Sequence, residues 1–64
     1  MNEIKPKFNR MYTGHYFTIF NSIVYSARLN ETSKKWHVYI NNEWSCQADS
    51  CKDAKEIIKD KINE

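Results

Sequence analysis

Four side chains in this sequence, two cysteines and two histidines, are of the types that bind metal ions or act as nucleophiles. Cys46 and Cys51 are separated by four residues, and His15 and His37 precede them. The gap is slightly longer than in common zinc knuckles, and the sequence has no second cysteine pair to complete such a site. Cys51 also falls on the apolar side of a predicted helix, where a thiol packs as a small hydrophobic group. We therefore expect no metal, no cofactor and two free thiols.

Catalysis is not expected either. A catalytic site needs a nucleophile, a base and an orienting group within hydrogen-bonding reach, usually in a pocket of several hundred Å3. A chain of 64 residues leaves little room for such a pocket. Its serines, aspartates and glutamates fall almost entirely in predicted turns, at the start of the helix or on its polar side. The sequence thus predicts a protein that is not an enzyme.

Aromatic and basic side chains are better candidates for function, and the function they favour is binding. The sequence holds two Trp, four Tyr and three Phe, with 41% hydrophobic residues, which is too apolar for a disordered chain. Trp and Tyr commonly anchor protein interfaces, and Lys and Arg form their rims and steer the approach of partners. The predicted binding residues are Tyr16, Arg28, Lys34, Lys35, His37, Tyr39 and Trp44.

The distribution of charge leaves a second kind of partner open. The formal net charge is +2, made of +4 in residues 1–40 (six basic, two acidic) and −2 in residues 41–64 (four basic, six acidic). Basic residues beside exposed aromatic rings could contact phosphates while the rings stack on bases. Lys5, Lys7 and Arg10 would join the basic residues above in this role. The low net charge favours a protein partner over a nucleic acid.

A C-terminal amphipathic helix is the clearest element that could position these residues. Cys51, Ala54, Ile58 and Ile62 recur at helical spacing, and charged residues occupy the opposite side. Ser50 is placed to cap the helix by accepting a hydrogen bond from the amide three residues later. A helix of about thirteen residues is only marginally stable alone in water, so its apolar side must pack on another element.

Several short strands precede the helix. Tyr16–Phe20 is rich in strand-forming residues, and Asn21-Ser22 is read as a tight turn into Ile23–Leu29, although one bent strand with a bulge is the alternative. Trp36–Ile40 and Glu43–Gln47 follow, joined at Asn41-Asn42.

The loop length at Asn41-Asn42 decides which side chains share a face of the sheet. A two-residue loop pairs Ile40 with Glu43 and Tyr39 with Trp44, and directly paired residues share a face. Cys46 then joins His37, Tyr39 and Trp44 on one face. A three-residue loop would place the hydrophobic residues together, but it would put Glu43 in a left-handed conformation. We therefore favour the two-residue loop.

Both faces of the predicted sheet then carry aromatic residues, and one helix covers only one of them. We expect the helix to cover Trp36, Val38 and Ile40, and to leave His37, Tyr39 and Trp44 exposed, with Tyr16 beside them. An exposed aromatic patch on a small domain commonly marks a partner site. In the alternative, the N-terminal strand or arm folds over these rings and makes them ordinary core.

These elements predict an α+β fold: a small antiparallel sheet of three to four strands with one C-terminal amphipathic helix on one face (βββα or ββββα). Residues 1–10 are expected to form a flexible basic arm, and residues 11–64 a single domain. The first ten residues contain no apolar signal segment, and no apolar run reaches the roughly 20 residues of a membrane span. We expect a cytoplasmic protein with no membrane partner.

Three segments of the sequence resemble the sheet-then-helix core of HicB-like antitoxins: Tyr25–Leu29, Trp36–Ile40 and Ala48–Lys55. The layout is also similar to small accessory proteins encoded by bacteriophages. The family's glycine-containing turn and Pro-Gly sequence are absent, so the resemblance implies a layout and a mode of action rather than antitoxin activity. It implies a small inhibitor or modulator that docks on a larger host protein, in the host cytoplasm if phage-encoded. A homodimer through the same face or through an edge strand, and a nucleic-acid partner, are the alternatives.

Overall fold

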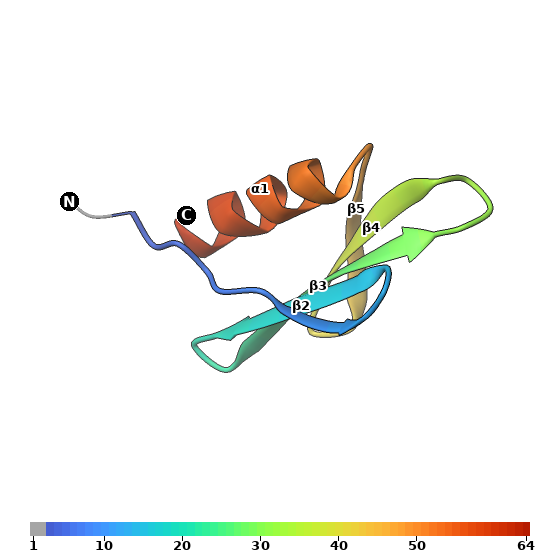
Figure 1. The fold of residues 1–64 in the computed structure, drawn as a ribbon. Coiled ribbons are helices and arrows are strands. Elements are labelled where there is room, and N and C mark those ends of the chain that lie inside the picture. Colours follow the sequence, from blue (N-terminus) through green and yellow to red (C-terminus); the bar gives the residue numbers. More distant parts are fainter. Residues whose placement is uncertain (1–2) are drawn as a thin grey trace.

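A five-stranded antiparallel sheet and one helix make up the fold. The structure is a computed structural model, and it describes residues 3–64. The strands follow one another across the sheet in chain order, and the helix lies across one face (Figure 1). The elements are β1 (Asn9–Tyr12), β2 (His15–Phe20), β3 (Ile23–Asn30), β4 (Lys35–Ile40), β5 (Glu43–Ala48) and α1 (Cys51–Ile62). The α+β class, the antiparallel sheet and the C-terminal helix are confirmed, whereas three to four strands was too few.

The additional strand, β1, begins inside the segment expected to be an arm. It pairs with β2 through Asn9 opposite Phe17 and Arg10 opposite Tyr16, with an irregularity before Tyr12. Its four residues, Asn-Arg-Met-Tyr, are all exposed, and they do not alternate between apolar and polar side chains. The strand exists because β2 offers a free edge, and that cause is not local in sequence.

Residues 3–8, ahead of β1, lie along α1 (Figure 1). The Ile4 backbone N–H donates to Asn63 Oδ1 at 2.8 Å, and Asn63 Nδ2 donates to the Ile4 carbonyl at 2.9 Å. Glu3 forms an ion pair with Lys59, and Phe8 packs against the core. The expected flexible arm thus has specific contacts from residue 3 onward in the structure. Its first two residues lie outside the described range.

Two tight turns set the register of the sheet. Asn21 and Ser22 have φ values of 51° and 64°, and Asn41 and Asn42 have 51° and 67°. Left-handed conformations at both central residues characterise the type I′ turn, whose twist suits two-residue hairpins. The turn at Asn21-Ser22 and the two-residue loop at Asn41-Asn42 are therefore confirmed.

The core lies between α1 and the central strands. Buried Ala54, Ile58 and Ile62 project from the helix at the predicted spacing toward β3, β4 and β5. Ser50 caps the helix as expected, since its side-chain oxygen accepts from the Asp53 amide at 3.1 Å. The buried core residues are Tyr25, Ala27, Val38, Ala48, Ala54, Ile58 and Ile62. Within residues 3–64, no helix has the length and apolar composition needed to cross a membrane.

Candidate binding surface

The sheet face turned away from α1 carries a row of side chains that crosses four strands. Phe17 on β2 pairs with Ser26 on β3, Ser26 pairs with Tyr39 on β4, and Tyr39 pairs with Trp44 on β5. Directly paired residues point to the same side of a sheet, so these four form one line, which we name the aromatic row. Ser26 is 3% exposed in the middle of this line.

A second line, the basic row, runs parallel to the aromatic row. It consists of His15, Arg28, His37 and Gln47, which are paired in that order across β2 to β5. The two rows touch: the Arg28 guanidinium carbon lies 5.1 Å from the centre of the Tyr39 ring, and the His37 and Trp44 ring centres are 6.4 Å apart. A cation held over a ring in this way is favoured electrostatically.

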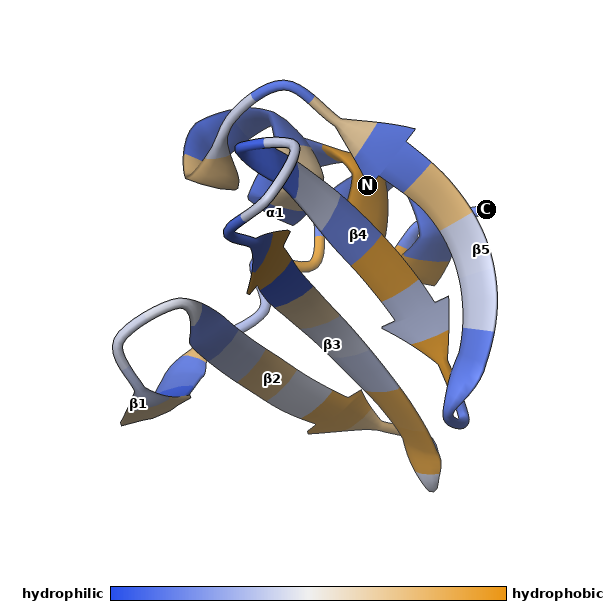
Figure 2. Cartoon of the chain, turned by 90° about the vertical axis from the view of Figure 1, so that its right-hand side faces the viewer, coloured by the Kyte–Doolittle hydropathy of each residue, from blue (hydrophilic) through white to orange (hydrophobic). Residues whose placement is uncertain are grey.

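The three rings of the aromatic row are not sealed beneath the rest of the chain, whereas Ser26 and His15 are buried. Trp44 is 57% exposed, and Tyr39 and Phe17 are half-buried. Figure 2 shows the sheet in front of α1, with this face toward the viewer. The N-terminal segment lies along α1 on the other side, so it does not cover the rings as the alternative proposed. We call this surface the open face: Tyr12, His15, Phe17, Ile19, Val24, Ser26, Arg28, His37, Tyr39, Trp44 and Gln47.

Two residues expected on the open face lie on the helix side instead. Tyr16 pairs with Ala27, and Lys55 Nζ of α1 lies 4.4 Å from the centre of its ring. Cys46 pairs with Val38, because the register shifts between Val38 and Tyr39 and leaves Ser45 as an extra residue in β5. Such a bulge reverses the alternation of side chains on one side of it. The placements of Tyr16 and Cys46 on the open face were therefore wrong.

Three hydrophobic residues of the open face were missed, two of them exposed (Tyr12 and Ile19) and one half-buried (Phe17), and part of the signal was available. The turn at Asn21-Ser22 places Phe20 opposite Ile23, from which Phe17 opposite Ser26 and Ile19 opposite Val24 follow by counting. Applying that count would have placed Phe17 and Ile19 on the open face and Tyr16 against the helix. Tyr12 depends on β1, which the sequence does not reveal.

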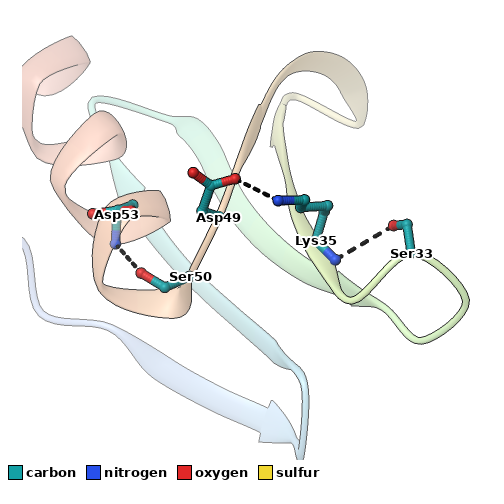
Figure 3. Close-up of polar contacts among 5 residues, drawn as sticks. All are labelled: Ser33, Lys35, Asp49, Ser50 and Asp53. Atoms are coloured by element: carbon teal, nitrogen blue, oxygen red, sulfur yellow. Dashed lines mark hydrogen bonds and ion pairs between the residues drawn. The ribbon is translucent and has the colours of Figure 1, made fainter.

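The basic residues at the margin of the open face differ in their availability. Lys35 Nζ lies 2.7 Å from Asp49 Oδ1, and this hydrogen-bonded ion pair lowers the pKa of Asp49 (Figure 3). Lys34 is exposed in the turn between β3 and β4 with a φ of 61°. Arg28 is exposed and stacks on Tyr39. Arg28 therefore contacts the aromatic row, whereas Lys35 is paired with Asp49.

The titratable groups of this face do not gather into a metal-binding cluster in the described structure. Among residues 3–64, no three His, Cys, Asp or Glu side chains gather as metal ligands. Burial, with a smaller contribution from the Arg28 charge, lowers the pKa of His15. Cys46 and Cys51 are both half-buried free thiols. The chemistry that this surface offers is apolar contact, stacking and hydrogen bonding.

Comparison with known proteins adds no relative: no family model, curated protein or solved structure matches this chain.

Proposed function

We infer that this protein is a non-enzymatic binding module that docks through its open face on a larger protein and inhibits or modulates it. The observation that supports this inference is the aromatic row, in which Trp44 is 57% exposed beside Tyr39. The helix covers the other face of the sheet, so it does not shield this row. Trp and Tyr at the centre of an interface contribute much of the binding energy. A partner that covers them would also shield apolar area that the domain leaves in water.

The charges on the open face indicate the chemistry of the partner. Among the paired strand positions on this face Arg28 carries a positive charge, and no carboxylate is present. A partner surface with an apolar centre and an acidic rim would complement the open face in both charge and hydrophobicity. The role of a phage-encoded modulator acting in the host cytoplasm belongs to the same proposal and rests on the sequence resemblance alone.

Substitution of Trp44 tests the proposal. Trp44→Ala should reduce capture of the partner from a native host lysate about 30-fold or more, which corresponds to loss of an interface hot spot. The fold should be kept, because changes at an exposed site usually alter stability by no more than about 0.5 kcal/mol. Affinity would be measured by titration with the captured protein after its identification, with Trp44→Phe expected to keep part of the binding.

Met11→Ala is the matched control, because Met11 is 59% exposed on β1 but belongs to neither row. Partner capture should be unchanged in this variant. Equal capture by wild type and Trp44→Ala would contradict the proposal. Size-exclusion chromatography at two concentrations would show whether the occupant of the face is instead a second copy of the chain.

Nucleic acid is the second candidate, because the Arg28 guanidinium over Tyr39 beside exposed Trp44 is also an arrangement that stacks single-stranded bases. The two candidates differ in their response to salt. Binding of an oligonucleotide should weaken with a linear dependence of log affinity on log salt, whereas docking through Trp44 and Tyr39 should be much less sensitive.

A further inference from the structure

A groove separate from the open face lies between the N-terminal segment and α1. Its volume is about 570 Å3, within the range of small-ligand sites. The contacts of Ile4 with Asn63 and of Glu3 with Lys59 hold one wall of the groove against the helix. The groove is on the helix side of the sheet, so it cannot be part of the docking surface proposed above.

Lysine side chains dominate the lining of this groove. Lys5 enters from the N-terminal segment, and Lys52, Lys55 and Lys59 enter from one side of α1, with Glu56 as the one carboxylate among the lining residues. Glu3 pairs with Lys59, and this contact raises the pKa of Lys59 and lowers the pKa of Glu3. The ion pairs found within residues 3–64 do not include the other three lysines, Lys5, Lys52 and Lys55.

One of these lysines is held in place by aromatic rings. Lys55 Nζ lies 4.4 Å from the centre of the Tyr16 ring and 5.4 Å from that of Phe8. These cation–π contacts restrict a side chain that would otherwise lose considerable freedom on binding an anion. Phe8 also lines the groove and adds apolar surface to it. The site therefore combines a positioned cation with a surface for a hydrophobic group.

The length of the groove suits a short extended peptide. Its lining runs along α1 from Lys52 to Lys59, a rise of about 10 Å, which is the length of about three residues in an extended chain. Carboxylates at alternate peptide positions would lie about 7 Å apart on one side of such a chain. A long phosphodiester strand fits less well, because a second depression beside α1 is lined by Asp53, Glu56 and Asp60.

We propose that the lysine-lined groove binds a short acidic peptide segment that carries an apolar side chain near its carboxylates. The site goes beyond the proposed function, because it would give the protein a second binding surface on the side opposite the open face. One partner could then be held at the aromatic row while an acidic segment occupies the groove.

The test is a titration of 15N-labelled protein with a capped pentapeptide of alternating Glu and Leu, followed by NMR at low salt. Saturable shifts are expected in residues 5–8 and 51–59, while the Trp44 indole N–H does not move. Lys52→Glu should weaken the peptide about five-fold or more, since it replaces an attraction with a repulsion. Lys52 is exposed, so the variant should fold.

Lys61→Glu is the matched control: it makes the same charge change on α1 outside the groove, and should weaken the peptide less than about two-fold. Equal weakening by the two variants would overturn the proposal, as would tighter binding of an oligothymidylate with the same formal charge. Trp44→Ala must bind the peptide like wild type. Failure of the peptide with intact Trp44-dependent capture would reject the groove alone, and the reverse would reject the docking face alone.

Discussion

At the scale of single residues, His15 shows how the sheet treats a titratable group. It is 6% exposed between Tyr12 and Arg28, and its Nδ1 has no hydrogen-bond partner among the described residues. Burial and the neighbouring positive charge both disfavour the protonated ring, so its pKa is lowered from the usual value near 6.5. The folded protein therefore keeps this histidine neutral at a pH where the unfolded chain would bind a proton.

The free energy of unfolding should consequently fall as the pH is lowered below about 6.5, because the unfolded state then binds the extra proton. The fall should end once the pH passes the lower pKa of the folded state. For one proton the slope is at most about 1.4 kcal/mol per pH unit. Urea denaturation at a series of pH values would measure it. His15→Gln should remove this contribution, and His37→Gln should keep it; an unchanged slope in His15→Gln would contradict the assignment.

The backbone at Ser22 offers a second prediction at this scale. Ser22 has a φ of 64° in the turn between β2 and β3, a conformation that glycine adopts without a steric penalty. Ser22→Gly should raise the free energy of unfolding by about 0.5–1 kcal/mol, after the greater freedom of glycine in the unfolded chain is subtracted. Thermal denaturation would measure the change.

Ser33→Gly is the contrasting variant. In the wild-type protein the Ser33 side-chain oxygen accepts a hydrogen bond from the Lys35 amide at 3.3 Å, and the φ of Ser33 is not in the left-handed region. This substitution should lower stability. If Ser22→Gly also lowered the free energy of unfolding, backbone strain at Ser22 would not be a significant cost to the stability of the protein.

At the scale of elements, α1 depends on its first turn. A helix of twelve residues is too short to be stable alone, so both its cap and its packing matter. Ser50→Ala should reduce stability by about 1 kcal/mol and the melting temperature by about 4–8 °C, because the Asp53 amide loses its acceptor (Figure 3). Ser50→Gly should lower stability by only a few tenths of a kcal/mol. Equal losses in both variants would argue against capping as the cause.

The sequence was informative about elements wherever the cause of an element is local. The helix, its cap and the two asparagine-led turns follow from residues within a few positions of each other. The bulge at Ser45 could not be predicted, because it depends on how β5 twists against β4. As a result the open face was correctly placed at His37, Tyr39 and Trp44 but wrongly given Cys46.

At the scale of the whole molecule, contacts between the two ends of the chain organise the helix side. Asn63 makes both a donor and an acceptor hydrogen bond to Ile4, which is 59 positions away in the sequence. No local pattern predicts such a contact, which is why residues 1–10 were expected to be flexible. The lysine-lined groove was missed for the same reason, because it forms only when this segment lies on α1.

Asn63→Ala should release the N-terminal segment and speed tryptic cleavage after Lys7, since cleavage needs the backbone to leave its packed position. Cleavage after Lys5 is blocked by Pro6, so one product reports on the segment. The measurement is the rate of product formation by mass spectrometry. Glu64→Ala changes the neighbouring residue and should leave the rate unchanged. The same rate in Asn63→Ala would show that the contact with Ile4 does not hold the segment.

The hydrogen-bonded pair of Ile4 and Asn63 also decides what an attached tether would obstruct. Both residues lie on the side of α1, so a linker fused at either terminus leaves the molecule there. Protein immobilised on a sensor by either end would present Trp44 to the solution and crowd the groove. The turn at Asn41-Asn42 follows the C-terminal end of β4 and is close to Trp44 in the sequence. Immobilisation through this turn would leave the groove accessible and restrict approach to Trp44.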